Sequence, residues 1–372
     1  MRVVLVLTQP PLAEGGAPGK TAIGLLRGLQ GHGVDVRALA ARRHFTVTGD
    51  VPPGLPVEIV DVEPPGPWRA RLQRVRRPVG ELAGGSFAAA VHDAAGDADV
   101  VHLEETETAW CDEGLETPSL VHVHYLARSD RSLGLPWQRQ FREVLDRARA
   151  ERAAVRRHRY LVASSPVVAD ELRRVAPGAE VVVAPLSLDP ALYEPARLDG
   201  PPTAGLIGTA AWAPTAQAMR TLLEDVWPLV RREVPGARLV LAGRGTERLG
   251  LSPARDVELA GEVASARDLF QRLSVLLFPL ERGSGMKVKV LESLASGVPV
   301  VTTAAGAEGI GPSAGVSVHE SPEALAAAAS EVLASEAERR ERGAAARAEF
   351  ERRFTPGPAT EPLVELYRHM AS

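Results

Sequence analysis

Residues 278–301 combine the residue types that can hold an anionic ligand. An apolar run ends at Pro279, and Gly283 and Gly285 follow, where the lack of a side chain lets the backbone approach a ligand closely. A helix is predicted over 286–296, and the unpaired N–H groups and dipole at its start favour negative charge. This order of strand, glycine turn and helix predicts a phosphate-binding turn.

All three lysines of the chain lie in or beside glycine-rich turns, although 43 residues are basic. They are Lys20, Lys287 and Lys289. A compact ammonium is favoured where a planar guanidinium would not fit. Glu292, two turns into the predicted helix, can accept hydrogen bonds from two neighbouring hydroxyls. A phosphate and a diol together describe a nucleotide-linked sugar, and an ordinary strand–turn–helix connection with surface lysines is the alternative.

The elements that must position these residues alternate between strands and helices. Residues 2–8 form an apolar run typical of a buried parallel strand, a helix-period segment follows at 21–31, and 34–39 is the next strand. A proline-rich stretch at 185–205 ends this block, and the same alternation recurs over 205–318. The predicted fold class is α/β, with two Rossmann-like doubly wound parallel sheets facing a cleft.

The length and composition of the chain exclude several classes of protein. The length of 372 residues exceeds the range of about 250–300 residues at which single cores stop growing, so we expect two domains, 1–187 and 188–356. A formal net charge of -4 argues against a protein that binds nucleic acid through bulk positive charge. One cysteine, Cys111, excludes a disulfide framework and a cysteine-built zinc site. The apolar start at 3–7 is too short to span a membrane and lacks a signal-peptide profile, so we expect a cytoplasmic protein.

The segment 278–301 resembles the donor-binding segment of family 4 of the retaining glycosyltransferases, which have the B-type fold of two Rossmann-like domains. The resemblance spans most of the chain. It includes the loop at Gly15 and Gly16, the strand at 118–124, Ser164, Gly208 with 212–214, and the segments 243–245 and 259–263. In that family a terminal helix crosses back onto the first domain, which implies that 357–372 joins 1–187.

The resemblance also implies roles for individual residues. The candidate catalytic residues are His124, which would reach the donor sugar, together with Lys287 and Ser284. Glu292 would bind the donor ribose, and Val263 would meet the base. The candidate donor-binding residues are Gly15, Gly16, Gly208, Arg244, Val263, Arg282, Gly283, Gly285, Met286, Lys287, Val288 and Glu292.

Two departures from the family pattern concern charge at the donor. Ser284 stands where the family has the first glutamate of a pair, so a neutral hydroxyl replaces a carboxylate near the reacting carbon. After Gly208 many members have an arginine and a lysine that grip the diphosphate, and this chain has neither. Lys287, Lys289 or Arg282 are the available replacements.

Residues 19–21 suggest a rival chemistry, because glycine, lysine and threonine in that order resemble a nucleotide-hydrolysing phosphate loop. That motif needs a glycine where this chain has Glu14, whose charge would repel a phosphate. Pro18 also lacks a backbone N–H. The pattern therefore favours a donor or acceptor contact by Lys20 over ATP hydrolysis.

Three histidines near strand ends, His102, His122 and His124, could bind a metal. Alternation places His122 and His124 on one face of a strand. No paired carboxylate is identified that would complete a site, so we predict no metal site and interpret His122 as a packing residue. Residues 97–99 imitate the aspartate pair of metal-dependent A-type glycosyltransferases, but they precede a strand, which favours a turn.

The sequence therefore predicts a metal-independent, hexosyltransferase-type enzyme. It would move a sugar, with retention, from a nucleotide-diphosphate sugar (a UDP- or GDP-sugar) to a hydroxyl of a small-molecule, glycan or lipid-linked acceptor. No bound cofactor and no nucleic-acid partner are expected. The basic segment 68–77 could lie on an anionic membrane at the inner face, and a solvated helix is its simpler interpretation. A sugar-nucleotide epimerase and a catalytically silent nucleotide-sugar-binding subunit remain alternatives, and the arginine- and alanine-rich composition suggests a bacterial source.

Overall fold

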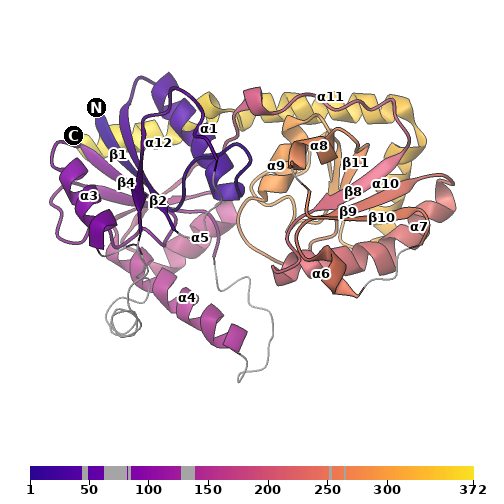
Figure 1. Cartoon of the computed structure of the whole chain (residues 1–372), viewed down its shortest axis with the longest axis horizontal. Coiled ribbons are helices and arrows are strands. Elements are labelled where there is room, and N and C mark those ends of the chain that lie inside the picture. Colours follow the sequence, from indigo (N-terminus) through magenta and orange to yellow (C-terminus); the bar gives the residue numbers. More distant parts are fainter. Residues whose placement is uncertain (44–48, 63–81, 83–84, 127–138, 251–253, 264) are drawn as a thin grey trace. The chain divides into compact units, whose positions relative to one another are not determined.

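The structure, a computed structural model, describes residues 1–43, 49–62, 82, 85–126, 139–250, 254–263 and 265–372. The chain divides into two compact units, Met1–Asp189 with Thr355–Ser372, and Pro190–Phe354 (Figure 1). Each unit has one sheet in which every strand pairing is parallel, with helices packed against it. The predicted fold class, two Rossmann-like α/β units, is confirmed.

The first unit has a seven-stranded sheet in the order β3-β2-β1-β4-β5-β6-β7. Its strands are β1 (Arg2–Leu7), β2 (Asp35–Arg42), β3 (Val57–Asp61), β4 (Val100–Glu104), β5 (Ser119–Val123), β6 (Tyr160–Ala163) and β7 (Glu180–Val183). Its helices are α1 (Ala17–Gly31), α3 (Gly85–Ala95), α4 (Arg139–Arg157), α5 (Pro166–Val175) and α12 (Pro356–Ala371). The chain order reverses between β1 and β4, which makes this the switch point of the sheet.

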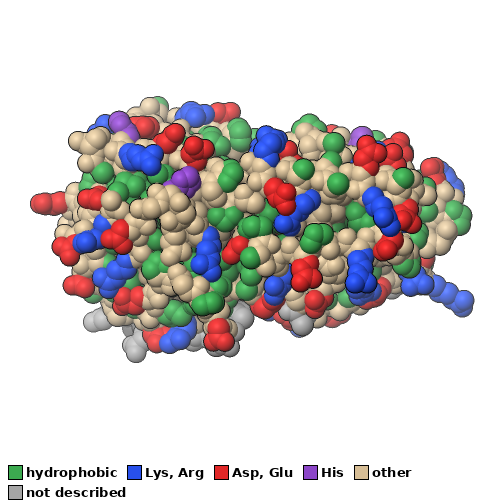
Figure 2. Space-filling model, turned by 90° about the horizontal axis from the view of Figure 1, so that it is seen from above, with side chains coloured by type: hydrophobic (Ala, Val, Ile, Leu, Met, Phe, Trp, Pro, Cys, Tyr) green, Lys and Arg blue, Asp and Glu red, His purple; other side chains and the backbone are tan. Residues whose placement is uncertain are grey.

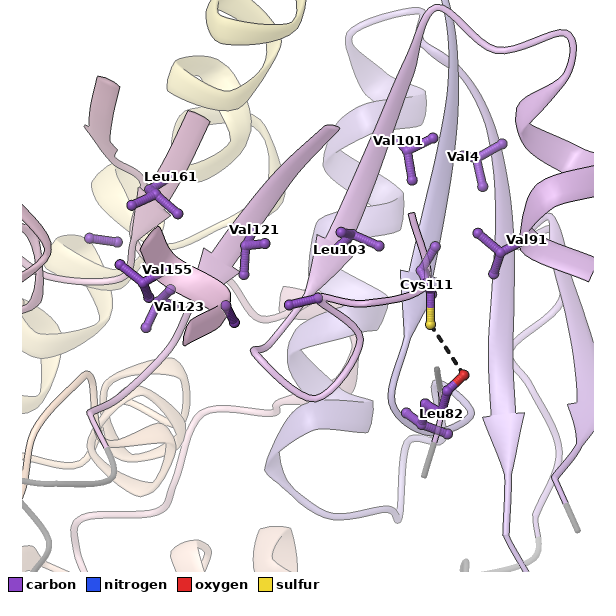
Figure 3. Close-up of a cluster of buried hydrophobic side chains, with 14 of the residues drawn as sticks. Val4, Leu82, Val91, Val101, Leu103, Cys111, Val121, Val123, Val155 and Leu161 are labelled. Atoms are coloured by element: carbon purple, nitrogen blue, oxygen red, sulfur yellow. Dashed lines mark hydrogen bonds between the residues drawn. The ribbon is translucent and has the colours of Figure 1, made fainter. Parts of the chain in front are cut away.

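Side chains that alternate along β1 enter two different cores. Val3 packs with α1 and α12 on one face of the sheet, and Val4 packs with α3 and α5 on the other. Figure 3 shows the second core, in which Sγ of Cys111 donates to the carbonyl oxygen of Leu82 at 3.3 Å. Burial raises the pKa of the Cys111 thiol to about 12, so this cysteine is a packing residue rather than a nucleophile.

Helix α12, the last helix of the chain, packs against α1 of the first unit, so both chain ends belong to that unit (Figure 1). Close packing here requires Gly28, because a Cβ at that position would collide with the side chain of Thr360. Farther along α12, Tyr367 is fully buried and its hydroxyl bonds to Nδ1 of His102 on β4. Helix α12 is thus held on the first unit by close packing against α1 and by a buried hydrogen bond to β4.

The second unit has a six-stranded sheet in the order β10-β9-β8-β11-β12-β13. Its strands are β8 (Thr203–Ile207), β9 (Arg238–Ala242), β10 (Val257–Gly261), β11 (Val275–Phe278), β12 (Val300–Thr302) and β13 (Val316–Val318). Its helices are α6 (Ala213–Thr221), α7 (Trp227–Glu233), α8 (Ala266–Phe270), α9 (Val288–Ala295), α10 (Pro322–Ala334) and α11 (Glu336–Arg353). Short helical turns η1 (Pro190–Leu192), η2 (Leu222–Val226) and η3 (Thr246–Leu249) join them.

Two predicted helices differ from the structure for local reasons. The helix predicted over 286–296 begins at Val288, because Lys287 has an extended backbone conformation and caps it. The long helix predicted over 212–232 is interrupted by η2, a π-helical turn that runs into Pro228 in the first turn of α7. Proline has no N–H to donate to the preceding turn, which accounts for the interruption there.

Acidic and basic side chains are interspersed over the face shown in Figure 2, in agreement with a net charge near zero. None of the helices in the described ranges combines the length and apolar character needed to cross a bilayer. The segment 68–77, considered above as a membrane contact, lies outside the described residues.

Candidate functional site

The glycine turn between β11 and α9 is compact and largely buried. Gly283 and Gly285 have φ angles of 131° and 74°, a region that favours glycine. Ser284 and Met286 within the turn are 7% and 6% exposed. The glycines of the sequence motif are therefore required by the backbone conformation, and the turn lies at the carboxyl end of a parallel strand, where ligands bind in this fold class.

Two charged side chains hold this turn in shape. Nζ of Lys287 donates to the carbonyl oxygen of Gly283 at 3.4 Å and to that of Gly285. On the other side, Oε1 of Glu308 accepts from the backbone N–H of Gly285 at 2.9 Å. Glu308 is buried and was not found by sequence analysis, because it follows β12 in a loop with no recognisable motif. A carboxylate of the chain thus occupies one of the backbone donors that the sequence assigned to the diphosphate.

Lys289 projects from the first turn of α9 toward the loop after β8. Its Nζ donates to Oγ1 of Thr215 at 3.1 Å and lies 4.5 Å from the ring centre of Phe278. A Cβ added at Gly208 would collide with the same nitrogen, so the ammonium lies directly against the Gly208 backbone. Gly208 is the position after which the family's arginine and lysine are missing here.

The ammonium of Lys289 has no carboxylate within 4.0 Å among the described residues. Burial lowers the pKa of Lys289 to about 7, the positive charge of Lys287 adds to this shift, and Glu292 opposes it. A cation held in this way is stabilised by an incoming anion. The arrangement therefore suits a ligand that carries negative charge.

Glu292 lies one turn farther along α9 and is 5% exposed. Its Oε1 accepts a hydrogen bond from the hydroxyl of Tyr193 at 3.2 Å. Tyr193 had no signal in the sequence, because it follows the proline-containing turn η1 rather than a strand end. The tyrosine hydroxyl thus links Glu292 to the segment that follows η1.

The other predicted donor-binding residues of this unit lie around the ends of β8, β9 and β10. A Cβ at Gly243 would collide with the backbone of Gly208, so these two strand ends approach closely. Nη2 of Arg244 pairs with Oε1 of Glu262 at 2.7 Å on the exposed surface, next to the half-buried Val263. This ion pair raises the pKa of Arg244 and lowers that of Glu262.

Two predicted donor-binding residues lie at the two ends of the glycine turn. Arg282 is exposed at its start, and Val288 is the first residue of α9, which follows the turn. The structure thus gathers residues 282–292 with Gly208 around one turn and one helix start. A hollow of about 690 Å³ lies at the opposite edge of the same sheet, at the amino ends of β8, β9 and β10. It is lined by Thr203, Arg238 and Val257 among others. That edge is opposite to the one where ligands bind in parallel sheets, so we do not assign the donor to it.

The glycines predicted at the donor in the first unit, Gly15 and Gly16, lie just before α1. The N–H of Gly15 donates to the carbonyl oxygen of Leu12 at 3.0 Å, and Gly16 has an extended conformation and caps α1. Lys20 follows in the first turn of that helix and is buried. These residues belong to a different unit from the β11–α9 turn.

The three histidines considered as metal ligands meet around one carboxylate that sequence analysis did not identify. Oε1 of Glu104 lies 3.0 Å from Nε2 of His102 and 2.8 Å from Nδ1 of His122, and Oε2 lies 2.6 Å from Nε2 of His124. The expectation that no carboxylate completes this cluster is therefore wrong, and His122 has a polar partner rather than only packing contacts. The register pairs Glu104 of β4 with His122 of β5, so alternation along both strands could have revealed the cluster.

Burial and charge act against each other in this histidine cluster. Burial disfavours the carboxylate form of Glu104, yet His124 and His122 hold its pKa well below the usual range. Burial lowers the pKa of His122 to about 4, so its ring is neutral at pH 7. Burial opposes the charged form of His124 as well, but the contact with Glu104 raises the pKa of His124 above its ordinary value. His124, the predicted sugar contact, is thus held in place by a buried carboxylate.

Two protein-family models match the chain in sequence. Residues 16–187 match the model described as "Glycosyl transferase 4-like domain", and residues 201–335 match "Glycosyl transferases group 1". No curated protein matches the chain significantly in sequence.

Solved structures that resemble the chain are glycosyltransferase folds of distant sequence. Sucrose-phosphate synthase from Thermosynechococcus elongatus superposes with a TM-score of 0.73 at 17% identity, over 100% of this chain and 99% of that one. HepE of Anabaena, solved in complex with UDP and glucose, gives 0.65 at 15% identity over 99% and 100%. The catalytic domain of starch synthase IV from Arabidopsis thaliana, bound to ADP and acarbose, gives 0.68 at 13% identity over 100% and 99%. The chain therefore carries glycosyltransferase domains on the two-Rossmann fold of the GT-B enzymes.

Proposed function

We propose that this chain, with its glycosyltransferase domains over 16–187 and 201–335, moves a sugar from a nucleotide-diphosphate sugar to an acceptor hydroxyl with retention. The observation that carries this proposal is the ammonium of Lys289 at the Gly208 backbone, with no carboxylate partner among the described residues. It takes the place of the basic pair that many family members have after that glycine. A diphosphate is an anion of the right chemistry to neutralise it.

The donor diphosphate would lie between the start of α9 and the loop after β8. Lys289 would donate to its oxygens, Lys287 would keep the glycine turn in shape, and Glu292 would accept from the ribose hydroxyls. UDP and ADP in the structural neighbours support a nucleotide-diphosphate donor of this kind, and a UDP- or GDP-sugar is our first choice. Val263 and Arg244 at the end of β10 and β9 would meet the base.

The reaction would break the bond between the anomeric carbon and the diphosphate oxygen, and the electron pair would leave with the diphosphate. A positively charged side chain that is already in position before the reaction stabilises this leaving group. Such preorganised electrostatic stabilisation is usually the largest contribution to the rate acceleration. The acceptor oxygen would attack from the same face, and its proton would pass to the departing phosphate oxygen. No metal and no enzyme nucleophile take part in this scheme, and Ser284 would bind a sugar hydroxyl.

A catalytically silent subunit that binds the nucleotide sugar is the second candidate. Two observations favour it: Ser284 replaces a carboxylate at the reacting carbon, and Glu308 occupies the N–H of Gly285. Binding would then be retained without turnover.

The experiment that separates these candidates uses UDP-, GDP-, ADP- and TDP-sugars labelled in the sugar. Binding is measured by calorimetry and turnover by release of free nucleotide with and without acceptors. Binding with slow nucleotide release supports transfer, and the anomeric configuration of the product, measured by NMR, tests retention. Binding with no release for any acceptor supports the silent subunit, interconversion of the sugars supports an epimerase, and no binding at all contradicts the proposal.

A further inference from the structure

The cluster around Glu104 brings together the side chains that commonly bind a metal ion. One nitrogen each of His102 and His122 and one oxygen of Glu104 all lie within 4.8 Å of one another. All three residues are buried, with exposed fractions of 0%, 3% and 6%. The two nitrogens already lie 3.0 and 2.8 Å from Oε1, and ligand atoms of a tetrahedral zinc site are about 3.4 Å apart for bond lengths near 2.1 Å. Outward shifts of a few tenths of an ångström would admit the ion.

Hydrogen bonds within the cluster leave several buried ring nitrogens without a partner. Nε2 of His102, of His122 and of His124 are all buried without a hydrogen-bond partner. Two of these atoms lie 3.0 Å or less from the carboxylate of Glu104, but without hydrogen-bond alignment. His122 faces Glu104 with Nδ1 instead. Buried polar nitrogens are almost always paired, so the unpaired Nε2 atoms of His102 and His124 beside one carboxylate indicate a missing partner.

The neighbours of the three ligands are those of a metal site. Metal-bound histidines usually donate their second ring N–H to an oxygen, and Nδ1 of His102 bonds to the hydroxyl of Tyr367. The second oxygen of Glu104 is in contact with His124, which orients the carboxylate. A cavity of about 10 Å³, lined by Glu104, His122 and Thr21, is close to the size of one water, which can supply a fourth ligand.

Charge in the cluster also fits a divalent ion. Oε1 of Glu105 lies 3.5 Å from Nδ1 of His124, so two carboxylates, Glu104 and Glu105, face the buried histidines. A divalent ion is attracted by this pair of negative charges. Glu105 has a φ of 63°, which is uncommon for a residue other than glycine, and strained positions of this kind concentrate at functional sites.

We propose that His102, Glu104 and His122 bind one divalent ion, Zn²⁺ in the first place, because imidazole and carboxylate ligands in a small buried site suit that ion. The ion has a structural role: it joins β4 to β5 and, through Tyr367, holds α12 on the first unit. It takes no part in the transfer scheme above, so the two proposals stand or fall separately.

The test starts from untagged full-length protein, stripped with a chelator and then titrated with Co²⁺ and with Zn²⁺. We expect one ion per chain, the visible absorption of tetrahedral or five-coordinate cobalt, and a melting temperature that rises with Zn²⁺ concentration. Glu104→Gln should lose binding at least tenfold. The matched control is Asp112→Asn, which alters another buried carboxylate–histidine contact, the 3.0 Å pair with His158, and should bind the ion as wild type does.

Two results would overturn this proposal. One is stripped wild-type protein that takes up less than a tenth of an equivalent of either ion, with no change in melting temperature. The other is equal ion binding by Glu104→Gln and Asp112→Asn, which would show that the ion binds elsewhere. The cobalt titration of wild-type protein decides the question even where Glu104→Gln does not fold.

Discussion

Replacing Lys289 with methionine tests the donor site through a single charge. The substitution keeps an unbranched apolar side chain against Phe278 and removes the ammonium. That ammonium has one described acceptor, Thr215, so donor groups remain for a ligand. Hydrogen bonds to charged groups contribute about 1.5–3 kcal/mol, so we expect the nucleotide sugar to bind about 10- to 150-fold more weakly. Calorimetry with a nucleotide-diphosphate sugar measures this change.

The same titration reports proton uptake. Because burial lowers the pKa of Lys289 to about 7, most of this side chain is neutral at pH 8, and a bound diphosphate would draw a proton onto it. The observed binding enthalpy at pH 8 should then depend on the ionisation enthalpy of the buffer, with uptake of close to one proton, about 0.9. Lys289→Met should lose this dependence, whereas Lys20→Met should keep it. Wild-type affinity in Lys289→Met, or no buffer dependence in wild type, would refute the assignment.

The pH dependence of the free energy of unfolding tests the environment of Lys289 without any ligand. Folding lowers the pKa of Lys289 from 10.5 to about 7, so between these pH values the unfolded chain holds the proton and the folded chain does not. The free energy of unfolding should therefore rise with pH from about 7 to 10.5, by less than the full 1.4 kcal/mol per pH unit because the side chain is half-buried. Lys289→Met should lack this rise in urea unfolding experiments.

Three further predictions concern the turn and the packing of the first unit. Lys287→Ala should weaken nucleotide-sugar binding far more than Lys20→Ala in a thermal-shift titration, and equal effects would count against the position given to the diphosphate. Glu308→Leu should lower the free energy of unfolding by about 1–3 kcal/mol, because it leaves a buried backbone N–H unpaired, while Glu308→Gln keeps an acceptor; equal losses would show that the hydrogen bond does not matter. Gly28→Ala should destabilise the protein by about 1–3 kcal/mol through collision with α12, and Gly31→Ala in the same helix, with open space around it, should be neutral or stabilising; the reverse order would contradict the packing.

The fold was predictable because parallel strands buried on both faces leave continuous apolar runs between helix-period segments. The strand at 2–8 and the glycine turn at 283–285 were found in this way. Helix ends were less predictable: α9 starts at Val288 because the backbone of Lys287 is extended, which its sequence does not indicate. The interruption at η2 could have been anticipated from Pro228, since proline cannot donate the N–H that a continuous helix needs.

The site was predictable where a motif lies in one continuous segment. Residues 282–292 form such a segment, and the structure places them together. Tyr193 and Glu308, which contact this segment from 99 and 23 residues away, depend on tertiary packing and have no local pattern. Glu104 is intermediate: its alternation with His102 was visible, but its partnership with β5 required the strand register.

Phosphorus NMR of a bound nucleotide sugar tests the central claim, that Lys289 holds a diphosphate at the start of α9, most directly. Addition of wild-type protein should shift or broaden both phosphorus resonances of the ligand. The effect should be absent or much reduced at the same concentration of Lys289→Met and retained with Lys20→Met. Unchanged resonances with wild type, for every nucleotide sugar tested, or equal changes with both variants, would contradict the account.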